Sequence, residues 1–375
     1  MTLRFAVVPS CAARRQQPVQ PASPQAARLW QITFLLAFTA LALPCSGAQI
    51  VPLEGPWLAA CLKVRHSSTL LRERPGQVLQ EVSPHRAFDC VVAGPERTVL
   101  GFSGCDAVRF GAGGEEQRVW RLPDPVRSCL RLAEGAYLLL LGGRWENTEL
   151  RQARAALWQP GQNALSYSQQ VPEAWNPFEL AGEGGDTLAA QQVLVAVRKT
   201  APFDTVFRRR PFLFSFQAGA CDLVPLWKGT SVAHPHLAAK LAHLDLGPGP
   251  QLCALEQLQD GRRMLGAYSF SGRMQMVAAT PPSTLGNSLE VLRGAPGEAD
   301  LLVCIVKAGA QWRAVAYGAG RATESGAVQC LQPRLQTKPC AALPIAWNVV
   351  RGGQGPGVLS LSKSGEVTFS ALRAL

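Results

Sequence analysis

Three of the five histidines lie in one short stretch, VAHPHLAAKLAHLD. Along an extended strand, His234 and His236 project to the same side, as two metal ligands must. No third ligand follows at a spacing typical of a metal centre, although His243 and Asp245 lie close in the sequence. A polar loop is therefore the favoured interpretation and a metal site the alternative, while His234 and His236 remain candidate ligand-binding residues.

A second candidate site is cationic and aromatic: the segment RKTAPFDTVFRRRPFLFSF, residues Arg198–Phe216. Guanidinium groups beside aromatic rings can bind phosphate groups, carboxylates or polymers that contain sugars. The alternative is a loop whose arginines are exposed to solvent and whose phenylalanines only pack locally. Because binding residues are common in loops, this segment is our first candidate for a contact surface. Its candidate ligand-binding residues are Arg198, Lys199, Arg208, Arg209 and Arg210.

The sequence carries none of the short motifs that mark common enzyme classes: no G-x-S-x-G, no H-E-x-x-H, no P-loop, and no G-x-G-x-x-G after a strand. We therefore expect a non-catalytic binding or scaffolding module. The alternative is a hydrolase or lyase directed at polysaccharide or cell wall. Its paired carboxylates would meet in a central channel from distant parts of the chain.

The first 48 residues have the composition of a secretory signal. A basic lead without acidic residues precedes an uncharged apolar stretch, LWQITFLLAFTALALPCSGA, which ends in small residues. We expect cleavage after Ala48, so that residues 1–48 are the signal peptide and residues 49–375 form one domain. An uncleaved N-terminal membrane anchor is the alternative. The protein is therefore expected to be exported, to the periplasm or the extracellular space.

The charge of the chain excludes a dedicated nucleic-acid protein. Removing the four arginines of the signal leaves 33 basic residues against 26 acidic ones, a formal charge of +7 instead of +11. These charges are scattered, which favours weak affinity for anionic surfaces. The expected partner is a protein or an anionic envelope or extracellular polymer, and a tether to the membrane would run through the N-terminus.

Nine of the 11 cysteines follow the signal, so at least one is unpaired in a monomer. Cys90, Cys253 and Cys304 lie in apolar runs and are expected to be buried as small hydrophobic residues. Cys330 and Cys340 flank a proline-containing loop and are the readiest candidates for a disulfide. There is no C-x-x-C motif of the kind found in zinc ribbons or thioredoxin-like sites.

The elements that position these residues are predicted to be strands. Hydrophobic residues make up 47% of the chain, with 35 glycines and 28 prolines. Short aliphatic runs recur about every 50 residues, and each is followed by an alternating strand that ends in a turn. An inner aliphatic strand followed by more polar outer strands is typical of propeller blades. The runs are FDCVVAG, AYLLLLG, QVLVAVR, QLCALEQ, DLLVCIV and GVLSLS.

We therefore predict an all-β protein, a β-propeller of about six blades, with a pair of β-sandwiches as the competing fold. The last repeat stops after its second strand, whereas the region after the signal offers two or three strands without a full blade. N-terminal strands that complete the last blade would close the ring and remove exposed sheet edges. Seven blades follow if these strands also form a blade of their own.

One repeat resembles a known family. AHLDLGPGPQLCALEQ followed by RRMLGAYSFSG is similar to a repeat of the FG-GAP/VCBS propellers, in which a D-x-D-x-D-G calcium loop precedes a strand. Asp245 stands at the first position of that loop, but Gly247, Gly249 and Pro250 replace its other key residues. Calcium needs several closely spaced oxygen ligands. The resemblance therefore implies the propeller scaffold with its calcium loops lost, and neither calcium nor another cofactor is expected.

Overall fold

The computed structural model describes most of the chain after Ala48, and its sheet-forming residues belong to one compact unit, Ser46–Leu375. Residues 1–47, most of the predicted signal peptide, lie outside the described residues, as do His234 and Asp245. No helix in the described part is long and apolar enough to cross a membrane. The described residues are 48–52, 58–64, 67–73, 80–81, 86–142, 144–146, 149–151, 154–162, 164–167, 175–182, 193–199, 208–217, 220–225, 236–244, 249–258, 260–269, 274–295, 297–320, 329–341, 343–352, 355–362 and 366–375.

The described strands group into seven antiparallel units in chain order, which we call sheets 1 to 7; six of them have four strands and the last has three. Sheets 5 and 6 are joined into one nine-stranded sheet by a short parallel pairing of Met276 and Val277 with Gln329 and Cys330. Sheet 1 contains β1 (Ala48–Pro52), β2 (Leu58–Val64), β3 (Ser67–Glu73) and β4 (Gln80–Glu81). Sheet 2 contains β5 (Cys90–Ala93), β6 (Val99–Ser103), β7 (Asp106–Phe110) and β8 (Glu116–Arg121). Sheet 3 contains β9 (Val126–Arg131), β10 (Tyr137–Leu141), β13 (Arg154–Gln159) and β14 (Ala164–Tyr167). A small hairpin, β11 (Arg144–Glu146) and β12 (Glu149–Arg151), is inserted between β10 and β13.

The remaining sheets follow the same plan. Sheet 4 contains β15 (Trp175–Gly182), β16 (Val193–Lys199), β17 (Arg208–Gln217) and β18 (Ala220–Pro225). Sheet 5 contains β19 (His236–Ala242), β20 (Gln251–Gln257), β21 (Arg263–Tyr268) and β22 (Met274–Thr280). Sheet 6 contains β23 (Thr284–Leu292), β24 (Leu301–Ala308), β25 (Gln311–Ala319) and β26 (Gln329–Gln336). Sheet 7 contains β27 (Ala346–Gly352), β28 (Gly355–Leu361) and β29 (Val367–Ala371), and a final strand, β30 (Arg373–Ala374), pairs with β26 of sheet 6.

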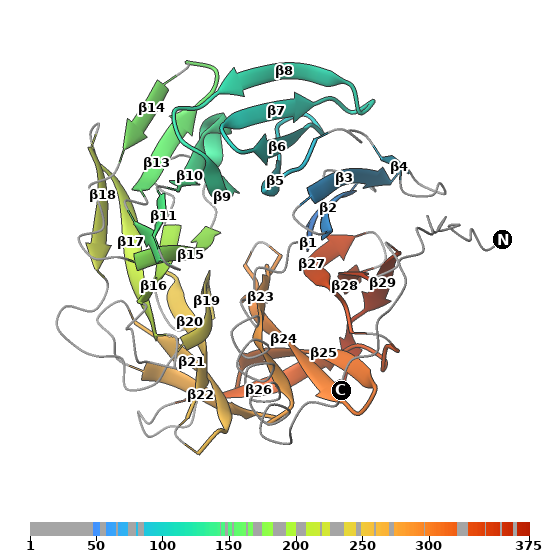
Figure 1. Ribbon diagram of the computed structural model, residues 1–375. Coiled ribbons are helices and arrows are strands. Elements are labelled where there is room, and N and C mark those ends of the chain that lie inside the picture. The colour runs from blue at the N-terminus through green and yellow to red at the C-terminus, as the bar shows by residue number, and fades with distance from the viewer. Residues whose placement is uncertain are drawn as a thin grey trace, which may run out of the picture. The chain divides into compact units, whose positions relative to one another are not determined.

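The first strands of successive sheets contact one another in chain order, and β27 of the last sheet contacts β1 of the first (Figure 1). At this closing contact Ile50 packs with Ala346 and Leu361, and the Asn348 side-chain amide donates a hydrogen bond to the Ile50 carbonyl at 3.1 Å. Consecutive antiparallel sheets that pack face to face and close on themselves form a β-propeller. The predicted fold class is therefore confirmed.

The N-terminal strands close the series differently from our expectation. They do not complete the last sheet; instead β1–β4 form a sheet of their own, and sheet 7 keeps three described strands. The described sheets thus match the alternative of seven blades rather than the preferred six. The last strand, β30, leaves sheet 7 and adds to sheet 6, where Arg373 lies opposite Gln336.

The aliphatic runs occupy second strands in five of the sheets, not the innermost strands that we predicted. In sheets 3 and 5, all five residues of β10 and the first six residues of β20 are buried. A strand in this position is covered by a neighbouring sheet on each face, which explains its continuous apolar sequence. The first strands are less apolar: in β9 only Val126 is buried. Sheet 2 is the exception, because the run FDCVVAG contains its first strand, β5.

The hydrophobic core consists of layers between neighbouring sheets. Between sheets 2 and 3, Trp158 packs edge-on against Trp120 and Phe102, with ring centroids 5.4 Å and 6.0 Å apart. Between sheets 5 and 6 the layer is mainly aliphatic and includes Leu255 and Leu302, both fully buried, beside one aromatic residue, Tyr317. Each layer joins two sheets, so the stability of one sheet depends on its neighbours.

The cysteine predictions have two outcomes. Cys90, Cys253 and Cys304 are buried, with exposed fractions of 3%, 0% and 0%, which confirms their role as small core residues. Cys330 and Cys340, the expected pair, are free thiols. Cys330 lies at the beginning of β26 and Cys340 beyond its end, so an extended strand separates them. The expectation of a disulfide between these two residues was wrong.

Candidate functional site

The cationic segment forms the end of a β-hairpin rather than a continuous loop. Arg198 and Lys199 are the last two residues of β16, and Arg208–Arg210 are the first three of β17. The intervening residues 200–207 lie outside the described residues. β17 then continues through Phe212, so the second half of the segment is strand. We call these five cationic residues the cationic hairpin.

The register of β16 and β17 brings the predicted residues together. Lys199 lies opposite Arg208 and Arg198 lies opposite Arg209, while Arg210 lies opposite Val197. Like charges that lie directly opposite one another destabilise a sheet unless another charge compensates them. Two consecutive cationic pairs therefore place four positively charged residues at one end of this hairpin in sheet 4, where an anionic group would relieve the repulsion.

Of the two candidate histidines, the structure describes one. His236 opens β19 and lies opposite Glu256 of β20, whereas His234 lies outside the described residues. Among the residues that the structure describes, no group of three or more His, Cys, Asp and Glu side chains could hold a metal ion. β19 contacts both β16 and β17, so His236 belongs to the sheet beside the cationic hairpin.

A polar network that our sequence analysis did not predict centres on Asp300, which lies in the turn between β23 and β24 and is 5% exposed. Its carboxylate accepts hydrogen bonds from the Arg293 guanidinium at 2.8 Å, from the backbone N–H of Gly294 at 2.9 Å and from the backbone N–H of His243 at 2.9 Å. The Asp300 N–H in turn donates to the His243 carbonyl at 2.7 Å. This buried charge is thus fully engaged, as burial of a carboxylate requires.

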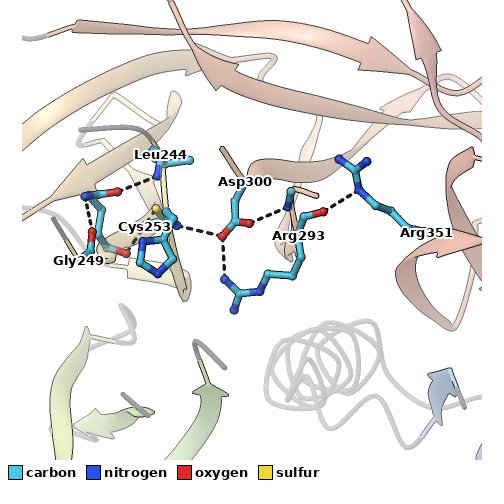
Figure 2. A network of polar contacts seen from close by, with 9 residues as sticks. Leu244, Gly249, Cys253, Arg293, Asp300 and Arg351 are labelled. Atoms are coloured by element: carbon cyan, nitrogen blue, oxygen red, sulfur yellow. Dashed lines mark hydrogen bonds and ion pairs between the residues drawn. The ribbon is translucent and has the colours of Figure 1, made fainter. Parts of the chain in front are cut away.

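The network continues into both neighbouring turns (Figure 2). In sheet 7, the Arg351 Nε donates to the Arg293 carbonyl at 2.7 Å. In sheet 5, the Gln251 side chain accepts from the N–H of Leu244 at 2.8 Å and donates to the Gly249 carbonyl at 3.0 Å. This turn is the one that resembles a calcium loop in sequence. Its described residues, Leu244 and Gly249, are held by the side-chain amide of Gln251.

The network joins sheets 5, 6 and 7 where their first strands turn into their second strands. Burial, and next the Asp300 carboxylate, raise the pKa of the adjacent Cys253 thiol, which keeps it protonated and unreactive at neutral pH. Asp300 at the centre of the network is buried, whereas the Arg293 and Arg351 side chains at its edge are 40% and 41% exposed. The hydrogen bonds of the network fix the relative position of three sheets.

A sequence signal for this network exists. The stretches RGAPGEADLLVCIV and RGGQGPGVLSLS both open with Arg-Gly, and these arginines are Arg293 and Arg351 of the network. Their repetition at equivalent turns marks them, but Arg293 binds a carboxylate in its own turn whereas Arg351 binds a backbone carbonyl in the turn of the neighbouring sheet. The residue types alone therefore did not reveal the contacts.

No protein-family model matches the chain, and no curated protein matches it in sequence. Solved structures do match. The BBS1N domain, crystallised in complex with ARL6DN, aligns with a TM-score of 0.55 and 12% identity over 88% of this chain and 91% of that one. The Dos1 propeller aligns with a TM-score of 0.52 and 8% identity over 87% of this chain and 81% of that one. At these identities the similarity establishes the fold alone: the chain is a β-propeller.

Proposed function

We propose that this protein is an exported, non-catalytic β-propeller that binds an acidic protein partner through the face that carries the cationic hairpin. The observation that carries the proposal is the register of β16 and β17, which sets Arg198 opposite Arg209 and Lys199 opposite Arg208. A structurally similar propeller, BBS1N, was crystallised with a protein partner, which supports protein binding as a use of this scaffold. Charge complementarity would provide both attraction and specificity for an acidic surface.

Topology defines the binding face. In every sheet the second strand turns into the third at the opposite end from the turn between the first and second strands. Lys199 ends a second strand and Arg208 begins a third, so the cationic hairpin lies on the face of second-to-third turns. His236 begins a first strand and belongs to this same face. The Asp300 network lies on the other face, where it leaves the proposed contact surface free.

The test uses the purified protein and three probes: a poly-glutamate peptide, an anionic glycan such as heparin, and a neutral peptide of equal length. We expect saturable binding of poly-glutamate by calorimetry, and its loss in the combined variant Arg208→Ala, Arg209→Ala, Arg210→Ala. The matched control changes the net charge by the same three units away from this face: Arg97→Ala in the first-to-second turn of sheet 2, combined with Arg118→Glu on its outer strand β8. Equal loss in both variants would mean that net charge alone drives binding and would contradict a specific face. Preference for heparin would assign the face to an anionic polymer instead.

Export follows from the N-terminal composition and is tested separately. Residues 1–48 fused to a bacterial alkaline phosphatase without its own signal should yield enzyme activity, because that phosphatase is active only after export. N-terminal sequencing of the mature protein should begin at Gln49. An intact N-terminus with an active fusion would indicate the uncleaved membrane anchor.

We further propose that the turns of this propeller are of the FG-GAP/VCBS type and work without calcium. The engagement of Asp300 by Arg293 supports this, because an internal guanidinium already provides the positive charge that a carboxylate in such a turn requires. The expected result is an unfolding temperature that changes neither with added calcium nor with a chelator. A rise with calcium and a fall with chelator would contradict it.

A further inference from the structure

A second anion-binding feature is a pocket of about 270 Å³ at the outer edge of sheet 6. It lies where β25, β26 and β30 meet the segment that follows β26. The side chains that define it are Arg313 from β25, Gln336 from β26, Thr337 and Lys338 from the following segment, and Arg373 from β30.

The backbone around this pocket is fixed on every side. Thr337 and Ala314 are joined by two hydrogen bonds, one from the Thr337 N–H and one to the Thr337 hydroxyl, each 3.0 Å long. Cys340 and Trp312 exchange backbone hydrogen bonds of 2.7 Å and 2.9 Å. The segment after β26 therefore stays alongside β25 as far as an isolated bridge between Cys340 and Trp312, which makes the pocket preformed.

β30, which supplies Arg373, is equally well anchored. Leu372 is 5% exposed in the layer between sheets 6 and 7, and its N–H donates to the Pro356 carbonyl at 2.9 Å. On the other side of Arg373, the N–H of Leu375 donates to the Arg334 carbonyl at 3.2 Å. A strand that crosses from one sheet to the next thus ends by placing a guanidinium beside the pocket.

Three positively charged side chains line the pocket. Arg313, Lys338 and Arg373 are all exposed, and none of them takes part in an ion pair with another residue of the described part of the chain. No acidic side chain is among the described residues that line the pocket. The Arg313 guanidinium donates to the Gln336 side-chain oxygen at 3.2 Å, which orients it. Three convergent cations without a counter-charge repel one another and favour a bound anion.

We propose that this pocket binds a phosphate monoester group. A dianionic phosphate compensates three cations better than a carboxylate, whose single charge would leave two of them unbalanced. Two planar guanidinium groups and an ammonium group also match the geometry of several phosphate oxygens. The pocket is open to solvent through its exposed cationic side chains, so the phosphate group can belong to a larger molecule. This site is independent of the cationic hairpin.

The experiment measures binding of inorganic phosphate, a phosphoserine peptide, its unphosphorylated form and acetate to the full chain by calorimetry. We expect saturable binding of phosphate and phosphoserine and none of acetate or the unmodified peptide. Arg313→Ala and Arg373→Ala should each weaken binding about tenfold or more. Lys338→Arg should retain it, and Arg118→Ala, an exposed cation on β8, should leave it unchanged. Circular dichroism confirms that each variant is folded.

Binding should also strengthen as pH rises from about 5 to about 7.5, because a phosphate monoester gains its second charge near pH 6. Tighter binding of the peptide than of free phosphate would identify a phosphorylated protein as the source, and the reverse would identify a small phosphate ester; either outcome supports the site. Phosphate binding that none of the pocket substitutions weakens, or no phosphate binding by the folded protein, would overturn the proposal.

Discussion

The carboxylate of Asp300 accepts a hydrogen bond from the backbone N–H of His243 at 2.9 Å, although the two residues lie 57 positions apart in the chain. The contact joins the first turn of sheet 5 to the first turn of sheet 6. Similar contacts join other neighbours: the Arg131 guanidinium of sheet 3 donates to the Gly94 carbonyl of sheet 2 at 2.8 Å. Side chains that reach the next turn thus supplement the apolar layers between sheets.

Replacing Asp300 with alanine should lower the free energy of unfolding by about 2–4 kcal/mol, because it leaves Arg293 and two backbone N–H groups without their acceptor. Urea denaturation measures the change. The matched control is Asp260→Ala: among the described residues this carboxylate bonds only to the nearby Arg262 on the surface, so its loss should have little effect. A loss for Asp300→Ala no larger than that of the control would show that the network does not hold the sheets together.

The fold class could be predicted from the sequence because the second strands are buried on both faces and can therefore be recognised as aliphatic runs. The blade count could not. The first strands carry a weaker signal, as in β23, TLGNSLEVL, and β27, AWNVVRG. Counting aliphatic runs thus gives six repeats, and the more mixed sequence of the N-terminal strands does not mark them as a separate blade.

The candidate site was predictable only in part. The types of Arg198, Lys199 and Arg208–Arg210 pointed to an anion-binding segment, but only the strand register shows that the two groups of residues lie opposite each other in the hairpin. The pocket that includes Arg313 and Arg373 had no sequence signal, because its residues come from strands that are far apart in the sequence. Contacts of this kind depend on how sheets are ordered and not on local pattern.

The aromatic layer between sheets 2 and 3 should depend on Trp158, which is 2% exposed and contacts three further aromatic rings, those of Phe102, Trp120 and Tyr137. Trp158→Ala should reduce the free energy of unfolding by about 3–5 kcal/mol, since neighbouring sheets cannot close over the cavity. Tyr167→Ala, at an exposed position of the same sheet, serves as the control and should cost less than about 1 kcal/mol. Similar values for both variants would place the main stabilising contacts elsewhere.

Replacing Tyr137 with phenylalanine should stabilise the folded protein. Its side chain is 1% exposed, and its hydroxyl has no hydrogen-bond partner among the described residues. Tyr137→Phe removes a buried polar group without changing the shape of the core, so the free energy of unfolding should rise by about 1 kcal/mol. Thermal unfolding at neutral pH measures the change, and a destabilised variant would imply a partner for the hydroxyl.

The same variant should alter the response to alkaline pH. Burial, and next the Cys129 thiol, raise the pKa of Tyr137 from 10.0 to about 12 in the folded protein. The unfolded chain therefore loses this proton first, and stability falls as pH rises from 10.0 to about 12. Denaturant titrations over this range should show a shallower decline for Tyr137→Phe than for the native protein. Identical declines would contradict the raised pKa.

Oxidation should not join Cys330 to Cys340 in the folded protein. Leu331, next to Cys330, lies opposite Ala319 at one end of β25, whereas Cys340 lies opposite Trp312 at the other. The length of extended strand between these positions is about 20 Å, far beyond the reach of a disulfide. After treatment with glutathione disulfide, mass spectrometry should find no peptide with this cross-link. Iodoacetamide should modify the exposed Cys330 in the native protein but reach the buried Cys253 and Cys304 only after denaturation. A Cys330–Cys340 cross-link formed without loss of the native circular dichroism would contradict the strand arrangement of sheet 6.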